Sequence, residues 1–265
     1  MTICIAAICE AHKAPEIVIC TDWKASSILG SAETLLKQRP LAHDWVCLTS
    51  GYESDIIAFV NLLRRRFREA SEITDENIIT IVNDAVSVRK KQKANEYTQG
   101  KYAISYDDFL VVGKDRLPAD LFRNTMVEIE RMTLGTELIL AGFSFGYPLL
   151  CHISDSGKSS LRENFAAVGE GGILANAALL HREQQEANTL PITLYNVYEA
   201  KKYSERVGSV GELTSITLLT TGGKTRMMLG AAGKEWLSQK FIELGPKPID
   251  KSLSFPQGFF YEMGE

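Results

Sequence analysis

The first extended stretch of the chain, residues 2–22, reads TICIAAICEAHKAPEIVICTD and points to a β-rich start. Two apolar runs, Ile3 to Cys9 and Glu16 to Thr21, flank a polar segment that contains Pro15. Short apolar runs separated by a polar turn are typical of an antiparallel hairpin. The chain is therefore predicted to begin inside a β-sheet.

Beyond this hairpin the patterns change from strand to helix. A further β-rich run, Trp45 to Thr49, leads through Gly51 into Ser54 to Arg68, where apolar residues recur at helical spacing. A second helix with a similar apolar stripe is predicted from Asp75, ahead of the charged stretch 89–93.

The second half of the chain repeats this alternation. Strands are predicted at 137–141 and 149–153, and a Gly-Glu-Gly-Gly turn at 169–172 opens an alanine-rich helix. Another helix is predicted at 194–206, and two strands, 213–221 and 225–230, flank the hairpin signal Gly222-Gly223.

The order of these elements predicts the fold class. Strands, two helices, strands, two helices and strands indicate an α+β protein with two antiparallel sheets flanked by helix pairs, a four-layer α-β-β-α sandwich. No repeat or linker interrupts the chain, so residues 1–265 are expected to form a single domain. Residues 94–132 show no sustained period apart from a possible helix at 121–131, which suggests an insertion, and 245–265 are taken as a C-terminal extension.

Composition excludes several classes of function. With 45% hydrophobic and 23% charged residues the chain can bury a sizeable core, and its net charge of -4 argues against a nucleic-acid partner. An apolar run long enough to cross a membrane is absent from the sequence, and its start lacks a basic leader, so a cytoplasmic location is expected. The five cysteines are read as reduced core residues, and the four scattered histidines predict neither a metal site nor a cofactor.

Thr2 is the candidate nucleophile. Methionine aminopeptidases remove Met1 before a small residue, which would leave Thr2 with a free α-amine. An α-amine has a pKa of roughly 8, so it can accept the hydroxyl proton directly or through a water. The alternative is an ordinary terminal threonine.

Three further residues are candidates to support Thr2. Asp22 ends the second strand of the hairpin, so strand pairing would return its carboxylate close to Thr2. A buried Lys37 ammonium paired with Asp22 would favour deprotonation of the hydroxyl. The N–H of Gly51, before a helix, suits an anionic oxygen. A turn residue, a solvated charge and a helix-entry glycine are the respective alternatives.

These residues, in this order and spacing, resemble a known family. The Met-Thr start, Asp22, Lys37 in a K-x-R-x-L context and Gly51 in a Gly-x-x-Ser-Asp helix start are similar to the proteasome β subunits and the related bacterial ATP-dependent peptidase, which are N-terminal nucleophile (Ntn) hydrolases. The runs ILAGF at 139–143 and AVGEG at 167–171 extend the likeness along most of the chain.

The resemblance implies a role for each residue. Thr2 would be the nucleophile, Asp22 the charge partner, Lys37 the ammonium that activates the hydroxyl, and Gly51 the oxyanion donor. It further implies peptide or amide substrates and a homo-oligomer such as a ring, without settling whether an ATPase or cap partner exists. The candidates to shape a specificity pocket are Leu35, Thr49 and Glu53.

Two departures from the family pattern bear on activity. Glu170 stands where the family has Ser, and its charge would raise the pKa of a nearby amine unless it points away. Residues 204–209 read SERVGS instead of Arg-Asp-x-x-Ser-Gly, with Glu205 expected to replace the Asp. The sequence thus predicts a threonine protease or amidohydrolase. The alternatives are a catalytically silent proteasome-like scaffold, which Glu170 and Gly208 would suit, and a small-molecule Ntn amidase.

Overall fold

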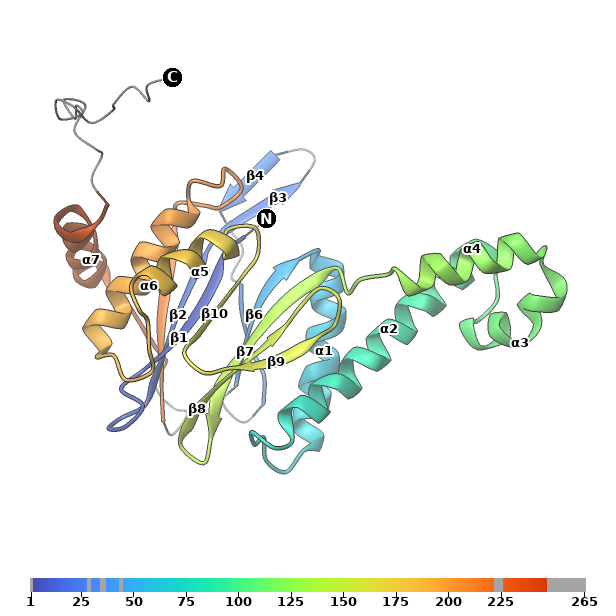
Figure 1. Ribbon diagram of the computed structural model, residues 1–265, viewed down its shortest axis with the longest axis horizontal. Coiled ribbons are helices and arrows are strands. Elements are labelled where there is room, and N and C mark those ends of the chain that lie inside the picture. The colour runs from blue at the N-terminus through green and yellow to red at the C-terminus, as the bar shows by residue number, and fades with distance from the viewer. Residues whose placement is uncertain (1, 28–29, 34–36, 43–44, 222–225, 247–265) are drawn as a thin grey trace, which may run out of the picture.

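The computed structural model describes residues 2–27, 30–33, 37–42, 45–221 and 226–246. Two five-stranded antiparallel sheets and flanking helices form the body (Figure 1). The sheet orders are β10-β1-β2-β11-β12 and β5-β6-β7-β8-β9, and β3 and β4 form a separate two-stranded ribbon. The prediction of an α+β protein with two antiparallel sheets is confirmed.

The first sheet contains the predicted opening hairpin. Its strands are β1 (Cys4–Cys9), β2 (Glu16–Asp22), β10 (Phe165–Val168), β11 (Thr214–Thr220) and β12 (Arg226–Met228). Cys4 lies opposite Thr21 and Cys9 opposite Glu16, so the predicted hairpin is confirmed. The second predicted hairpin is confirmed by the pairing of β11 with β12, although residues 222–225 of its turn lie outside the described residues.

The second sheet begins with a strand that the sequence patterns did not reveal. Its strands are β5 (Gln38–Pro40), β6 (Val46–Gly51), β7 (Thr136–Ser144), β8 (Tyr147–Ile153) and β9 (Ser159–Arg162), and the ribbon consists of β3 (Lys24–Ser27) and β4 (Gly30–Glu33). Three-residue β5 is too short for a recognisable period.

Seven helices lie within the described part of the chain. They are α1 (Glu53–Glu69), α2 (Ile78–Tyr102), α3 (Tyr106–Arg116), α4 (Ala119–Glu130), α5 (Gly172–His181), α6 (Leu190–Ser204) and α7 (Ala231–Leu244). The sequence analysis missed α3 and α7. None of these described helices is long and apolar enough to span a membrane.

Helix α2 differs from its prediction because it continues through the charged stretch 89–93 to Tyr102. Asp55 of α1 explains this, since its Oδ1 accepts a hydrogen bond from Arg89 at 2.8 Å and one from Lys93 at 3.1 Å. Arg89 is only 4% exposed. Charges that find counter-charges on a neighbouring helix do not end a helix, and good helix formers carry it onward.

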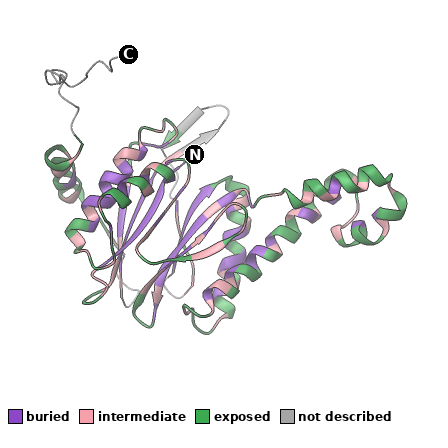
Figure 2. Ribbon diagram, in the orientation of Figure 1, coloured by how far each residue is buried: buried purple, intermediate pink, exposed green. Residues whose placement is uncertain are grey.

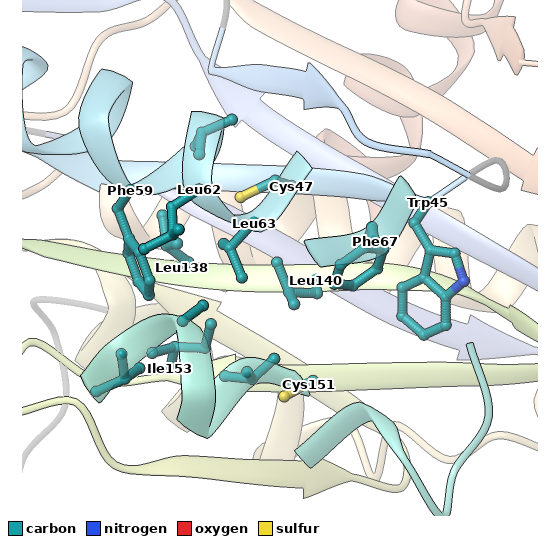
Figure 3. Close-up of a cluster of buried hydrophobic side chains, with 14 of the residues drawn as sticks. Trp45, Cys47, Phe59, Leu62, Leu63, Phe67, Leu138, Leu140, Cys151 and Ile153 are labelled. Carbon is teal, nitrogen blue, oxygen red and sulfur yellow. The ribbon is translucent and has the colours of Figure 1, made fainter. Parts of the chain in front are cut away.

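Hydrophobic side chains gather in three clusters, and burial concentrates on the sheets and on the helix faces that cover them (Figure 2). One cluster joins the two sheets and includes Ile19 of β2 and Ile139 of β7. A second packs α1 and α2 on β6, β7 and β8, with Trp45 edge-on to Phe67 (Figure 3). The third packs α5 and α6 on β1 and β2.

The region expected to be an insertion, 94–132, contains the C-terminal part of α2 together with α3 and α4. These helices extend away from the sheets (Figure 1). They have a small core of their own, in which Phe109 stacks on Tyr102 at 5.6 Å and on Phe122 at 5.1 Å between ring centroids. Of the expected C-terminal extension, residues 247–265 lie outside the described residues.

All five cysteines are buried and free, as the sequence predicts for reduced core residues. Burial raises the pKa of Cys9, Cys20 and Cys151 to about 12, and it raises the pKa of the other two as well. Because the thiolate is the reactive form, we expect none of these thiols to react quickly with Ellman's reagent at mildly alkaline pH. Denaturation should make all five thiols reactive. A rapidly reacting thiol in the native protein would contradict this.

Candidate active site

The carboxylate of Asp22 is the centre of the candidate site. Its Oδ1 accepts a hydrogen bond from Thr2 Oγ1 at 2.9 Å, one from the Ile3 N–H at 2.9 Å and one from Lys37 Nζ at 2.6 Å. The hydroxyl of the candidate nucleophile and the ammonium of Lys37 therefore meet at one oxygen atom. Of the four residues that the sequence analysis grouped, the structure thus brings three together at this carboxylate.

The second oxygen of Asp22 is equally well bound. Its Oδ2 accepts from the backbone N–H of Gly211 at 2.9 Å and from that of Lys24 at 3.3 Å. Asp22 is 0% exposed and Lys37 is 3% exposed. A buried charge is tolerated when it is paired and hydrogen-bonded, and five donors with one counter-charge meet that condition.

The opening hairpin places Asp22 beside Thr2. Because Cys4 lies opposite Thr21, the next residue of β2 falls beside Ile3, whose carbonyl accepts from the Asp22 N–H at 3.3 Å. This register brings the Asp22 carboxylate within hydrogen-bonding distance of the Thr2 hydroxyl.

Thr49 of β6 holds Lys37 in place. Its N–H donates to the carbonyl of Lys37 at 3.0 Å, and its hydroxyl donates to the same oxygen at 3.3 Å. Thr49 is itself buried. Thr49, which was expected to shape a specificity pocket, is thus observed to hold the backbone of Lys37.

A glycine turn packs against Thr2 from the first sheet. Gly169 has φ +93°, and a Cβ atom there would lie 2.9 Å from Thr2 Cγ2 and closer still to Thr2 O. The N–H of Gly171 points to Thr2 O at 3.4 Å. Glycine is required at 169 both for its backbone angle and for this close approach.

Gly51 ends β6 with φ +131°, and a Cβ there would lie 2.7 Å from Thr136 Cα. The packing of β6 on β7 is therefore enough to demand glycine. The preceding residue reaches the site, since a Cβ on Gly169 would lie 3.0 Å from Ser50 Oγ. The oxyanion role of Gly51 stays a prediction.

Glu170 and Glu205, the two acids that depart from the family pattern, contact residues other than Thr2. Glu170 is exposed, and its carboxylate accepts a hydrogen bond from the Ser209 hydroxyl. Glu205, just beyond α6, pairs with Lys202 at 2.9 Å and with Lys201. Lys201 is completely buried and needs this counter-charge.

Lys201 nevertheless ties Glu205 indirectly to the centre. Its ammonium also donates to the carbonyl of Glu212 at 2.7 Å, and the neighbouring Gly211 donates to Asp22. Glu205 thus supports the loop that holds Asp22. Of the remaining pocket candidates, Glu53 is exposed at the start of α1, whereas Leu35 lies outside the described residues.

Sequence reasoning missed four contributors: Lys24, Gly211, Ser204 and Glu137. Gly211 and Asp22 are 189 positions apart, and a backbone N–H carries no residue-type signal. Buried Ser204, at the end of α6, donates to the carbonyl of Gly171 at 3.0 Å. Glu137 of β7 accepts from the N–H of Gly169 at 3.2 Å. Only the dense glycines at 169–172 marked this turn in the sequence.

Within the described residues, no group of three or more His, Cys, Asp or Glu side chains is arranged to hold a metal ion. No protein-family model matches the chain, and a search of curated proteins finds no match either. The chemistry therefore has to be argued from the geometry of the site.

Proposed function

We propose that this protein is an N-terminal threonine hydrolase that cleaves amide bonds through Thr2 after Met1 has been removed. The observation that carries the proposal is the meeting of the Thr2 hydroxyl and the Lys37 ammonium at one oxygen of buried Asp22. The nucleophile and the electrostatic activator thus each lie within hydrogen-bonding reach of the same orienting carboxylate, an arrangement typical of activated nucleophiles.

Activity depends on cleavage of the Met1–Thr2 bond. While Met1 is attached, the nitrogen of Thr2 belongs to an amide and has no basic lone pair. Removal of Met1 creates an α-amine on the same residue as the hydroxyl, and this amine is the proposed general base.

The proposed reaction has two halves. The amine takes the proton from Oγ1, directly or through a water, while Oγ1 attacks the substrate carbonyl carbon. The positive charge of Lys37 stabilises the developing alkoxide, and the N–H of Gly51 is assigned to the oxyanion. The C–N bond then breaks, the leaving amine takes the proton, and water hydrolyses the acyl ester on Thr2 in the second half.

The arrangement of the clusters supports placing the chain among the Ntn hydrolases. One hydrophobic cluster between two sheets, with a helix pair on each outer face, is what a four-layer α-β-β-α sandwich requires. Peptide substrates, a cytoplasmic homo-oligomeric ring and a specificity pocket near Leu35, Thr49 and Glu53 rest on the family resemblance.

One observation favours a second candidate, a catalytically silent scaffold of the same fold. Thr2 is only 3% exposed in the chain that still carries Met1, so a substrate has little access to its hydroxyl. If Met1 is never removed, the Asp22 cluster serves only to hold the sheet end together.

Intact mass and peptide mapping, before and after treatment with a peptide epoxyketone or β-lactone, test the proposal. We expect loss of Met1 and one adduct on Thr2. Thr2→Ala should give no adduct, whereas Thr2→Ser should retain one because it keeps both hydroxyl and amine. Retained Met1, or a free Thr2 that stays unlabelled, would reject the enzyme in favour of the scaffold.

A further inference from the structure

Glu137 is a carboxylate placed where the sheet pattern leads us to expect an apolar side chain. It is the second residue of β7 and lies directly opposite Ser50 of β6. Ile139 and Ala141, which share its face of the strand, belong to the hydrophobic cluster between the sheets. Glu137 is half-buried at the end of this layer that is nearest Thr2.

Glu137 is hydrogen-bonded to a residue that packs on the candidate nucleophile. Its Oε2 accepts the N–H of Gly169 at 3.2 Å, and Gly169 is the residue whose backbone packs on Thr2. Ser50, opposite Glu137, also approaches Gly169 closely. Glu137 is therefore linked to Thr2 indirectly, through Gly169.

We propose that Glu137 is a positioning residue that holds the 169–171 turn against Thr2 and places a negative charge beside its α-amine. This inference rests on the proposed function, because the amine exists only after Met1 has been removed. Neither the family resemblance nor the sequence pattern assigned a role to this position.

The positioning effect follows from the contacts of the turn. Gly169 packs on Thr2, and the N–H of Gly171 points to Thr2 O. Without an acceptor at 137, the N–H of Gly169 loses its bond and the turn loses its anchor to the second sheet. A shift of about 1 Å at a nucleophile is enough to slow a reaction about 100-fold.

The charge effect depends on which other groups surround Thr2. Asp22 and Lys37 form a pair, and Glu170 is hydrogen-bonded to Ser209 at the surface. Beyond α6, Glu205 is balanced by Lys201 and Lys202, while Lys24 donates to the carbonyl of Gly208 at 2.8 Å. Glu137 brings a negative charge to the turn under Thr2 through its hydrogen bond with the Gly169 N–H.

His152 of β8 is the remaining titratable group near Glu137. Burial and the neighbouring Arg162 lower its pKa, and Glu137 partly opposes them. His152 is therefore neutral at neutral pH and adds no positive charge there. Its titration falls below that of an α-amine, so the two can be separated in a pH profile.

The sign of the charge effect is definite. A nearby carboxylate favours the ammonium form and so raises the pKa of the amine. The free amine is the base, so the acid limb of the activity profile follows this pKa. Removing the charge at 137 should therefore move the acid limb to lower pH.

Three variants of the Met1-free protein test the inference: Glu137→Gln, Glu137→Ala and, as a matched control on an exposed loop, Glu163→Gln. Glu137→Gln keeps an acceptor for Gly169 but removes the charge. We expect it to lower the Thr2 amine pKa, followed by NMR titration of isotope-labelled threonine, and to shift the acid limb of the labelling rate in parallel. Glu137→Ala should shift the acid limb in the same direction and also slow labelling about 10- to 100-fold on the plateau above it. Glu163→Gln should match the wild type.

The outcomes separate this inference from the proposed function. An unlabelled wild type with a shifted amine titration in Glu137→Gln would reject the hydrolase but keep the charge role of Glu137. A labelled wild type whose titration and labelling rate are unchanged in both variants at 137 would reject the inference alone. If Glu137→Ala does not fold, the titration of Glu137→Gln still decides the question.

Discussion

Replacing Asp22 by alanine is expected to abolish labelling of Thr2 and to destabilise the protein by about 3–5 kcal/mol, the cost of leaving a buried charge without its partner. Asp22 is 0% exposed and forms an ion pair with Lys37 at 2.6 Å. The change also removes the acceptor of the Thr2 hydroxyl and of three backbone N–H groups. Chemical denaturation and mass analysis after electrophile treatment measure the two effects.

A double-mutant cycle separates the charge pair from the rest of this effect. The double variant Asp22→Asn/Lys37→Met should be destabilised by less than the sum of the two single variants, because the Asp22–Lys37 interaction is lost only once. All variants that lose Asp22 should also lose Thr2 labelling. Additive free energies of unfolding would show that the pair has no special energetic role, and normal labelling of Asp22→Ala would contradict the proposed site.

Gly169→Ala is the second change with a large expected effect. At φ +93° a side chain strains the backbone, and the new Cβ would lie 2.9 Å from Thr2 Cγ2. Either the turn or Thr2 has to move, so we expect labelling of Thr2 to slow by about 100-fold or more. The fold should survive, because the strain is local and costs on the order of 1–3 kcal/mol.

Gly208→Ala is the matched control for this change. It lies in the loop after α6, close to the site, yet a Cβ there would meet nothing within 4 Å. Its labelling rate should equal that of the wild type. Equal rates for Gly169→Ala and the wild type would show that the turn does not set the position of Thr2.

Much of the fold could be predicted from local patterns. The hairpin of β1 and β2 was recognisable because apolar runs and a polar turn lie next to each other in the chain. Helix α1 carries its own apolar stripe, and α5 was recognisable from its alanines after the glycine turn. Local patterns failed for α2, since Asp55, from another helix, pairs with Arg89 and Lys93, two of the charges that seemed to mark its end.

The chain sequence by itself determined the components of the site that lie in one hairpin. Thr2 and Asp22 meet because the hairpin register, with Cys4 opposite Thr21, brings the Asp22 carboxylate within reach of the Thr2 hydroxyl. A small residue after Met1, a strand-end carboxylate and a lysine of suitable spacing were all visible as residue types.

Only the tertiary structure decided which groups complete the site. Gly211 and Lys24 bind Asp22 through backbone N–H groups, which every residue except proline possesses. The residue types at these positions therefore do not predict the contacts. Glu137 meets Gly169 because the two sheets pack face to face, and Glu170 turns to Ser209 at the surface. Such contacts join segments far apart in the chain, and their identity depends on packing that no local pattern contains.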